Sequence, residues 1–146
     1  MLRLPKSVDY GVLILLTLFE ADSDTPLSAQ QIAETCGLPH QQVAKLLKVL
    51  QRQDVVSSTR GPRGGYALKV DAGSMNLLAV HRLIEGPLTV TECMNPEDCQ
   101  CRAMASCRLR PYMEAVDRAL QQALEGITLA AISESRPVFA GWSLAV

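Results

Sequence analysis

The chain has 146 residues, of which 48% are hydrophobic and 20% are charged, and its formal net charge is −1. This composition is typical of one globular domain with a real core, and the near-zero charge gives no bulk sign of a nucleic-acid partner. The longest apolar run, residues 12–19, is too short to cross a bilayer, and the N-terminus lacks the apolar stretch of a signal peptide. We therefore expect a cytoplasmic protein without a membrane partner.

Two helices are predicted near the N-terminus. Apolar residues recur at helical spacing over residues 7–21, where Ser7 is the expected N-cap and Asp9 lies in the first turn. Ser28 and Gln31 have the spacing of a capping box, which indicates that a second helix begins after Ser28. Because a helix N-terminus attracts anions, Ser28 is also a candidate phosphate contact.

A third helix is expected over residues 39–53, with Pro39 in its first turn. One face is apolar and is expected to be buried, and it consists of Val43, Leu46, Leu47 and Leu50. The opposite face is polar and partly basic, and it consists of His40, Gln41, Gln42, Lys45, Lys48 and Arg52. A short helix, a turn and a second helix of this kind form the helix-turn-helix pattern of DNA-binding proteins.

A β-hairpin is predicted next. β-Branched residues over residues 55–60 and alternating residues over 66–70 indicate two strands, joined by the turn sequence Gly-Pro-Arg-Gly-Gly. A hairpin in this place is the wing of a winged helix-turn-helix. Gly64 lets the backbone approach a duplex closely, and Arg60 and Arg63 are candidates to enter a minor groove or to hold phosphates.

The second half predicts two further helices around a cysteine-rich loop. A fourth helix follows Ser74, its expected N-cap, and ends at Gly86. A long helix over about residues 107–125 has apolar residues at three-four spacing, and such a helix late in a small domain usually packs on a partner copy. Residues 127–132 add a short turn, and the tail from Ser133 has no periodicity and is expected to be disordered or weakly docked.

Four of the five cysteines lie within fifteen residues, spaced C-x5-C-x-C-x5-C, and they are Cys93, Cys99, Cys101 and Cys107. In a reducing cytosol, clustered thiols more often bind a metal or do redox chemistry than form disulfides. The spacing alone favours tetrahedral zinc and an iron–sulfur cluster about equally, and a metal-free thiol-redox site is a third alternative. Cys36 stands apart on an apolar helix face and is expected to be a buried structural thiol.

Together, the wing and the cysteine loop resemble the Rrf2 family of transcriptional regulators. The resemblance covers about residues 1–132 and is carried by Arg3-Leu4, Asp9-Tyr10, the wing sequence of residues 56–66, the cysteine loop and Gly126-Ile127-Thr128-Leu129. Within the family the chain is most similar to regulators of the SUF iron–sulfur assembly system, with IscR-like and NsrR-like members as cousins. The resemblance implies a mainly α, winged helix-turn-helix fold with a long C-terminal dimerisation helix. It also implies a homodimer with a [2Fe-2S] or [4Fe-4S] cluster in each subunit.

The resemblance implies three thiolate ligands to the cluster, which are Cys93, Cys99 and Cys107. The family commonly has fewer residues between its second and third cysteines than the seven between Cys99 and Cys107. Cys101 restores the shorter gap and is a candidate to replace Cys99 or to serve as the fourth ligand. The histidine of IscR-like members is Arg110 here, which excludes a histidine ligand at that place. NsrR-like members take an aspartate from the partner's first helix, and Asp9 stands at that position; its alternative role is to stabilise the helix dipole.

We expect the third helix to read a double-stranded DNA operator. Glutamine favours adenine and lysine favours guanine, so the candidates for base edges are Gln41, Gln42 and Lys45. His40 and Lys48 are expected to meet phosphates, and the alternative for this whole face is a solvated surface. No nucleophile–base pair or substrate pocket is legible in the sequence, so we expect no enzyme.

The predicted function is a DNA-binding repressor of iron–sulfur assembly genes that senses cluster status or redox or nitrosative stress. A zinc-stabilised or thiol-redox regulator without a cluster is the alternative. The predicted organisation is a winged helix-turn-helix DNA-binding domain over residues 1–86, a cluster loop over 87–107, a dimerisation helix over 108–132 and a flexible tail over 133–146.

Overall fold

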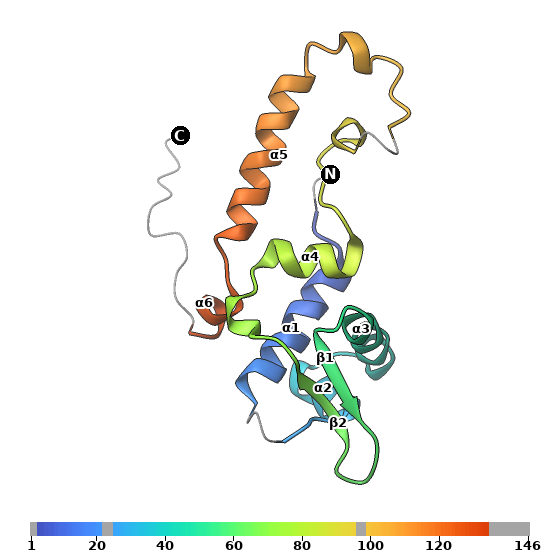
Figure 1. Ribbon diagram of the computed structural model, residues 1–146, viewed down its shortest axis with the longest axis vertical. Coiled ribbons are helices and arrows are strands. Elements are labelled where there is room, and N and C mark those ends of the chain that lie inside the picture. Colours follow the sequence, from blue (N-terminus) through green and yellow to red (C-terminus); the bar gives the residue numbers. More distant parts are fainter. Residues whose placement is uncertain (1–2, 22–24, 96–98, 135–146) are drawn as a thin grey trace.

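The computed structural model describes residues 3–21, 25–95 and 99–134. Within these ranges the chain is mostly helical and has a small antiparallel sheet of two strands. The helices are α1 (Lys6–Glu20), α2 (Ala29–Cys36), α3 (His40–Arg52), α4 (Leu77–Glu85), α5 (Arg110–Glu125) and α6 (Leu129–Ser133), and the strands are β1 (Val56–Thr59) and β2 (Gly65–Leu68). The hairpin tip and the loop between α4 and α5 lie at opposite ends of the molecule, and α5 extends away from the other helices (Figure 1).

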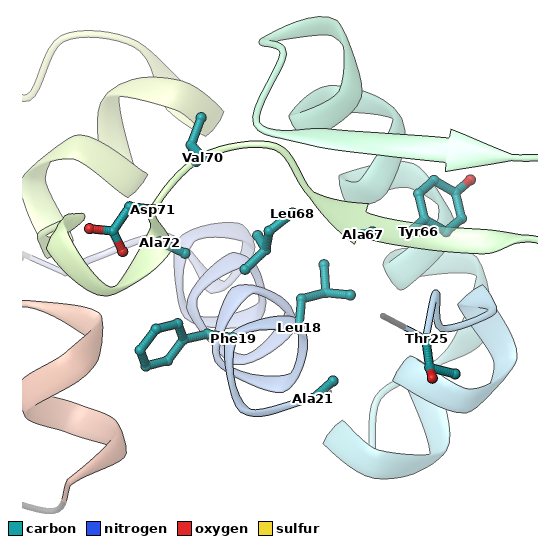
Figure 2. A pocket seen from close by; sticks show the side chains of 10 residues that line it. All are labelled: Leu18, Phe19, Ala21, Thr25, Tyr66, Ala67, Leu68, Val70, Asp71 and Ala72. Carbon is teal, nitrogen blue, oxygen red and sulfur yellow. The ribbon is translucent and has the colours of Figure 1, made fainter. Parts of the chain in front are cut away.

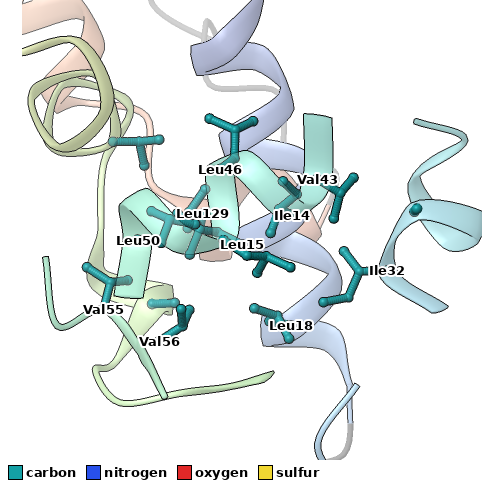
Figure 3. Close-up of a cluster of buried hydrophobic side chains, with 14 residues drawn as sticks. Ile14, Leu15, Leu18, Ile32, Val43, Leu46, Leu50, Val55, Val56 and Leu129 are labelled. Atoms are coloured by element: carbon teal, nitrogen blue, oxygen red, sulfur yellow. The ribbon is translucent and has the colours of Figure 1, made fainter. Parts of the chain in front are cut away.

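The core lies where α1, α2 and α3 meet. The apolar stripe predicted for α3 is buried, and side chains of α1 and α2 pack against it (Figure 3); the cluster includes Ile14, Leu15, Leu18, Ile32, Val43, Leu46, Leu47 and Leu50. Burying each of these aliphatic side chains stabilises the fold by about 1.5–3 kcal/mol. Because α3 buries one face, its polar face is left at the surface.

The capping box of α2 is confirmed. The Ser28 hydroxyl accepts a hydrogen bond from the Gln31 backbone N–H at 3.2 Å, and the Ser28 N–H donates to Gln31 Oε1 at 2.9 Å. Gly37 ends the helix in the left-handed conformation, with φ +65°. These contacts satisfy polar groups that a free helix end leaves unpaired.

The N-caps predicted for two other helices are wrong. Helix α1 begins at Lys6 after Pro5, and the Ser7 hydroxyl instead donates a hydrogen bond to Glu85 of α4. Ser74 lies in a 3-10 turn, and the N-cap of α4 is Asn76, whose side chain accepts from the Ala79 N–H at 2.8 Å. In both places the serine hydroxyl donates to another group and does not cap a helix: Ser7 donates to Glu85, and Ser74 donates to the Asp71 carbonyl.

Helix α5 begins at Arg110, later than predicted. Pro111 follows in its first turn, and a proline ring collides with the carbonyl of the residue four positions earlier when it stands inside a helix. A helix running from Cys107 through Pro111 is therefore disfavoured. At the other end, Ser133 closes α6 and donates to Glu20 at 2.7 Å, whereas residues 135–146 of the predicted flexible tail lie outside the described residues.

The base of the hairpin is attached to the segment before α2. Leu27 and Tyr66 exchange two backbone hydrogen bonds, at 2.7 and 3.0 Å, and so extend the sheet by one bridge. Gly65 lies so close to this segment that a Cβ atom on it would be 2.6 Å from the Leu27 carbonyl. The wing is thus attached to the helix-turn-helix by backbone hydrogen bonds as well as by its own chain connections.

Gly65→Ala tests this attachment. The added methyl group meets backbone and not a flexible side chain, so we expect a loss of about 1–3 kcal/mol in the free energy of unfolding, measured by urea denaturation. The matched control is Gly126→Ala, where the nearest atoms to a Cβ are 3.6 Å away. Equal stabilities for the two variants would contradict the close approach.

Candidate nucleic-acid interface and cysteine loop

The polar face of α3 is exposed as the sequence predicts. His40, Gln41, Gln42, Lys45 and Lys48 are all exposed, and the buried stripe lies on the opposite side of the helix. None of these five side chains forms an ion pair with a residue that the structure describes. Unpaired amines and amides on one exposed helix face are free to meet phosphates and base edges.

The wing has a fixed position relative to α3. Gln51 at the end of α3 donates from Nε2 to the Ser58 hydroxyl of β1 at 2.8 Å. At the tip, the Gly64 N–H donates to the Gly61 carbonyl at 2.9 Å, which closes the turn.

The basic residues of the wing differ in their partners. Lys69 forms an ion pair with Asp54, whereas Arg60 and Arg63 are exposed and have no ion pair among the described residues. These two arginines are the positive charges that the hairpin leaves available.

The N-terminus of α1 lies beside α3, which sequence reasoning missed. A cavity of about 310 Å³ is lined by Lys6, Ser7 and Tyr10 of α1 and, on the other side, by Pro39, Gln42, Lys45 and Leu46. Lys6 and Lys45 therefore flank one cavity. The sequence does contain one indication of this arrangement. Lys6 is in the first turn of a helix, where the helix dipole disfavours a cation, so a lysine at this position suggests another role for its charge.

Ser28 acts as an N-cap within its own chain. Its hydroxyl is half-buried and is occupied by the Gln31 N–H. Its predicted contact with a DNA phosphate stays a prediction.

The cysteine loop connects Gly86 at the end of α4 to Arg110 at the start of α5 (Figure 1). All four of its thiols are free; Cys101 is exposed and the other three are half-buried. The Cys93 sulfur lies 3.2 Å from the Thr91 hydroxyl, which restrains its side chain. The loop thus holds unpaired thiols that are reachable from solvent.

Three of these thiols line one cavity. Its volume is about 340 Å³, and it is lined by Cys93, Cys101 and Cys107 with Thr91, Glu92, Leu109, Arg110 and Met113. Cys99 does not line it. In the part of the chain that the structure describes, no three His, Cys, Asp or Glu side chains are close enough to hold one metal ion. The cavity therefore gathers three sulfurs without forming a closed coordination site.

Asp9 lies away from this cavity. It is exposed in the first turn of α1 and is not among the lining residues. Within one subunit Asp9 is therefore not among the residues around these thiols, and its predicted role as a ligand from the partner subunit stays a prediction.

One side of α5 is apolar and uncovered. Leu109, Tyr112 and Val116 are 59%, 71% and 46% exposed, and their spacing places them on one face of the helix. Large apolar side chains in a row at a surface typically mark a site that another protein surface covers.

A further cavity, of about 310 Å³, lies between the end of α1 and β2 (Figure 2). Its lining is mostly aliphatic and aromatic, and its acidic member Asp71 accepts a hydrogen bond from the Gly73 N–H at 3.1 Å, which closes the turn after β2. Asp71 therefore has a structural role, and the lining contains no acid–base pair.

The family follows from comparison with known proteins. The family model for Rrf2, described as an iron-dependent transcriptional regulator, matches residues 4–135. The chain belongs to the Rrf2 family. It is 31% identical over 121 residues to protein rrf2 of Nitratidesulfovibrio vulgaris, covering 83% of this chain and 80% of that protein. It is 26% identical over 137 residues to the transcriptional regulator IscR of Yersinia enterocolitica, covering 94% and 82%.

Solved structures of Rrf2 regulators share the fold. CymR, the global cysteine regulator of B. subtilis, has a TM-score of 0.72 at 23% identity and covers 94% of this chain and 100% of that one. IscR of T. potens has a TM-score of 0.71 at 24% identity and covers 97% and 93%. The predicted mainly α, winged helix-turn-helix fold is confirmed. Rrf2 members are DNA-binding transcription regulators and not enzymes, and in the described residues no helix is long and apolar enough to span a membrane.

Lys6→Ala tests whether the cavity beside α3 meets DNA. If Lys6 contacts a phosphate, the variant binds all duplexes more weakly, and the slope of log affinity against log salt falls by about 1. The measurement is a salt titration by fluorescence anisotropy, using a duplex that the unmodified protein selects from a random pool. Lys69→Ala is the control, because its amine already pairs with Asp54. An unchanged slope for Lys6→Ala would exclude the contact.

Proposed function

We propose that this Rrf2 regulator binds a double-stranded operator as a homodimer and that its cysteine loop senses iron–sulfur or redox status. The observation that carries the proposal is the gathering of Cys93, Cys101 and Cys107 on one cavity, in a loop whose two ends join α4 and α5. Iron–sulfur assembly genes are the proposed targets, and repression is the proposed mode.

On DNA, we assign α3 to the major groove. Gln41, Gln42 and Lys45 would meet base edges, His40 and Lys48 would meet phosphates, and Ser28 would place the N-terminus of α2 near the backbone. Arg60 and Arg63 would reach the adjacent groove or its phosphates, and Gly64 would let the wing approach closely. The exposure of the α3 and wing side chains and the Gln51–Ser58 hydrogen bond between α3 and β1 support this assignment.

A second copy of the chain is the proposed cover for α5. The exposed apolar face made by Leu109, Tyr112 and Val116 adjoins the cysteine cavity, since Leu109 lines both. A two-fold dimer would pair this face with itself. The α3 helices of the two subunits would then face two half-sites of the operator. Asp9 of the partner subunit would also be able to approach the thiols.

The donor set fits a soft metal centre. Thiolates suit iron–sulfur clusters and zinc, and a [2Fe-2S] or [4Fe-4S] cluster would supply a redox-active and oxidant-labile group at the cavity. Cys93 and Cys107 would be two of its ligands and Cys101 a third, because these three share the cavity. The remaining ligand would come from Cys99 of the same loop or from Asp9 of the partner subunit.

Ligation would act on the DNA-binding surface through the loop. Ligation by Cys93, Cys101 and Cys107 would tie the two ends of the loop together, and this would hold α5 at one angle to α4 and the rest of the subunit. Without that tie the angle would relax, so the distance between the α3 helices of the two subunits would change, and operator affinity would change with it. The alternatives, structural zinc and thiol-redox exchange without a metal, use the same sulfurs.

Anaerobic reconstitution tests the sensing proposal. We expect protein reconstituted with iron and sulfide to be brown and to bind a selected operator with an affinity at least about tenfold different from that of the metal-free form, which corresponds to about 1.4 kcal/mol of coupling. A Cys93→Ser/Cys107→Ser variant should lose both the colour and the difference. Colourless protein with stoichiometric zinc would favour the zinc alternative, and equal affinities of the two forms would exclude the switch.

Val116→Asp tests the homodimer. A charge in a buried apolar interface is costly to desolvate, so we expect a monomer by analytical ultracentrifugation at concentrations where the unmodified chain is a dimer. Operator affinity should fall with it. Arg118→Asp, on the opposite side of α5, is the control and should remain dimeric. If Val116→Asp also remains dimeric, the interface lies elsewhere.

A further inference from the structure

Helix α5 carries a buried carboxylate, Asp117, that has no role in the proposed mechanism. Asp117 is 8% exposed and is, with His81, one of two buried polar or charged residues in the described part of the chain. Burying a carboxylate is unfavourable unless hydrogen bonds replace its water. Its Oδ1 accepts from the backbone N–H of Val90 at 2.9 Å, and its Oδ2 accepts from Gln121 Nε2 at 2.6 Å.

Gln121 extends this contact to a third part of the chain. Its Nε2 also donates to the Leu88 carbonyl at 3.4 Å, and its Oε1 accepts from Arg82 Nη2 of α4 at 2.9 Å. Arg82, Leu88, Val90, Asp117 and Gln121 therefore form one hydrogen-bonded set, which we call the loop clamp. The clamp joins α4, α5 and the first residues of the cysteine loop.

The clamp lies directly before the first thiol of the loop. Val90 precedes Cys93 by three residues, and Cys107 precedes the first residue of α5, Arg110, by three residues. The chain itself ties Cys107 to α5, whereas the Val90–Asp117 contact ties the other end of the loop to the same helix. Both outer thiols are thus positioned relative to α5.

We propose that Asp117 is a positioning residue for the cysteine site: it holds the arm that carries Cys93 against α5, opposite Cys107. This inference rests on the proposed function, because it assumes that the cysteine loop binds a metal centre and assigns Asp117 the role of positioning one of the ligands. Loss of a residue that orients a metal ligand through a direct hydrogen bond typically weakens metal binding tenfold to a hundredfold, and Asp117 would act in the same way through the backbone that leads to Cys93.

Packing of α5 alone would not require a carboxylate at this position. An apolar side chain of similar size can pack a helix as well or better, because burying a charge offsets much of what its contacts contribute. Only an acceptor fixes the register of a loop backbone, since it pairs with one particular N–H. The register of Val90 decides where Cys93 lies, and this is what ligation needs.

Variants of the clamp test the proposal in the full chain. Asp117→Ala removes both acceptor oxygens, Asp117→Asn keeps one acceptor for Val90, and Gln121→Ala removes the links to Leu88 and Arg82. The matched control is Gln122→Ala, an exposed neighbour of the same residue type with no side-chain hydrogen bond among the described residues. The probes are hydrogen exchange at the Val90 amide, followed by NMR, and titration of the reduced protein with cobalt(II).

We expect Val90 exchange to accelerate at least about tenfold in Asp117→Ala, because the acceptor of the Val90 N–H is lost. The acceleration should be smaller in Gln121→Ala, because this variant keeps the Val90–Asp117 bond and loses only the bonds that Gln121 makes. Cobalt(II) affinity should fall tenfold to a hundredfold in Asp117→Ala and return most of the way in Asp117→Asn. Gln122→Ala should match the unmodified protein in both measurements. Should Asp117→Ala fail to fold, Gln121→Ala decides in its place.

The inference and the proposed function fail in different ways. Unchanged Val90 exchange and unchanged cobalt affinity in Asp117→Ala and Gln121→Ala would overturn the positioning role, even if the unmodified protein binds metal. A protein that binds no cobalt at all would overturn the thiolate site. Val90 exchange would then still decide whether the clamp holds the loop, because it needs no metal.

Discussion

The burial of one face of α3 against α1 is the constraint on which the rest of the molecule depends. Leu47 and Leu50 of α3 are fully enclosed together with Ile14 and Leu15 of α1. An α-helix that buries one stripe has no rotational freedom left, so its opposite face is set as well. The polar side chains that we propose to meet DNA are therefore positioned by the core and not by contacts of their own.

The same core determines how the cysteine loop is connected to that surface. Helix α4 approaches α1 closely at Gly11, where a Cβ atom would lie 2.2 Å from Ile84 Cδ1. Helix α4 is thereby packed against α1, which in turn packs against α3. From α4, the Arg82 side chain extends to Gln121 of α5. The path from Val90 to α3 consists of the hydrogen bonds of the loop clamp and of packed helices. Chains of packed helices and hydrogen bonds of this kind can carry coupling between two sites.

Local patterns predicted much of this arrangement, and distant contacts account for what they missed. The buried stripe of α3 and the capping box at Ser28 depend on residues within a few positions of one another, so periodicity and spacing were sufficient. Ser7 could not be placed, because its partner Glu85 is 78 residues away. For the site, residue type alone singled out the thiols. No local rule indicates that Lys6 flanks a cavity with α3, or that Asp117 holds the loop that precedes Cys93.

The size of the interactions indicates how the switch that we propose could operate in such a small domain. Coupling between two sites typically amounts to about 1–3 kcal/mol, and a hydrogen bond to a charged group contributes about 1.5–3 kcal/mol. Two bonds to the Asp117 carboxylate together contribute about 3–6 kcal/mol, which is at least as large as the coupling that the proposed switch would have to transmit. If ligation draws Cys93 towards Cys107, it favours the clamped position of the loop, and the clamp in turn favours ligation. The two equilibria would then be linked, so the loop would need little intrinsic order to act as the proposed sensing element.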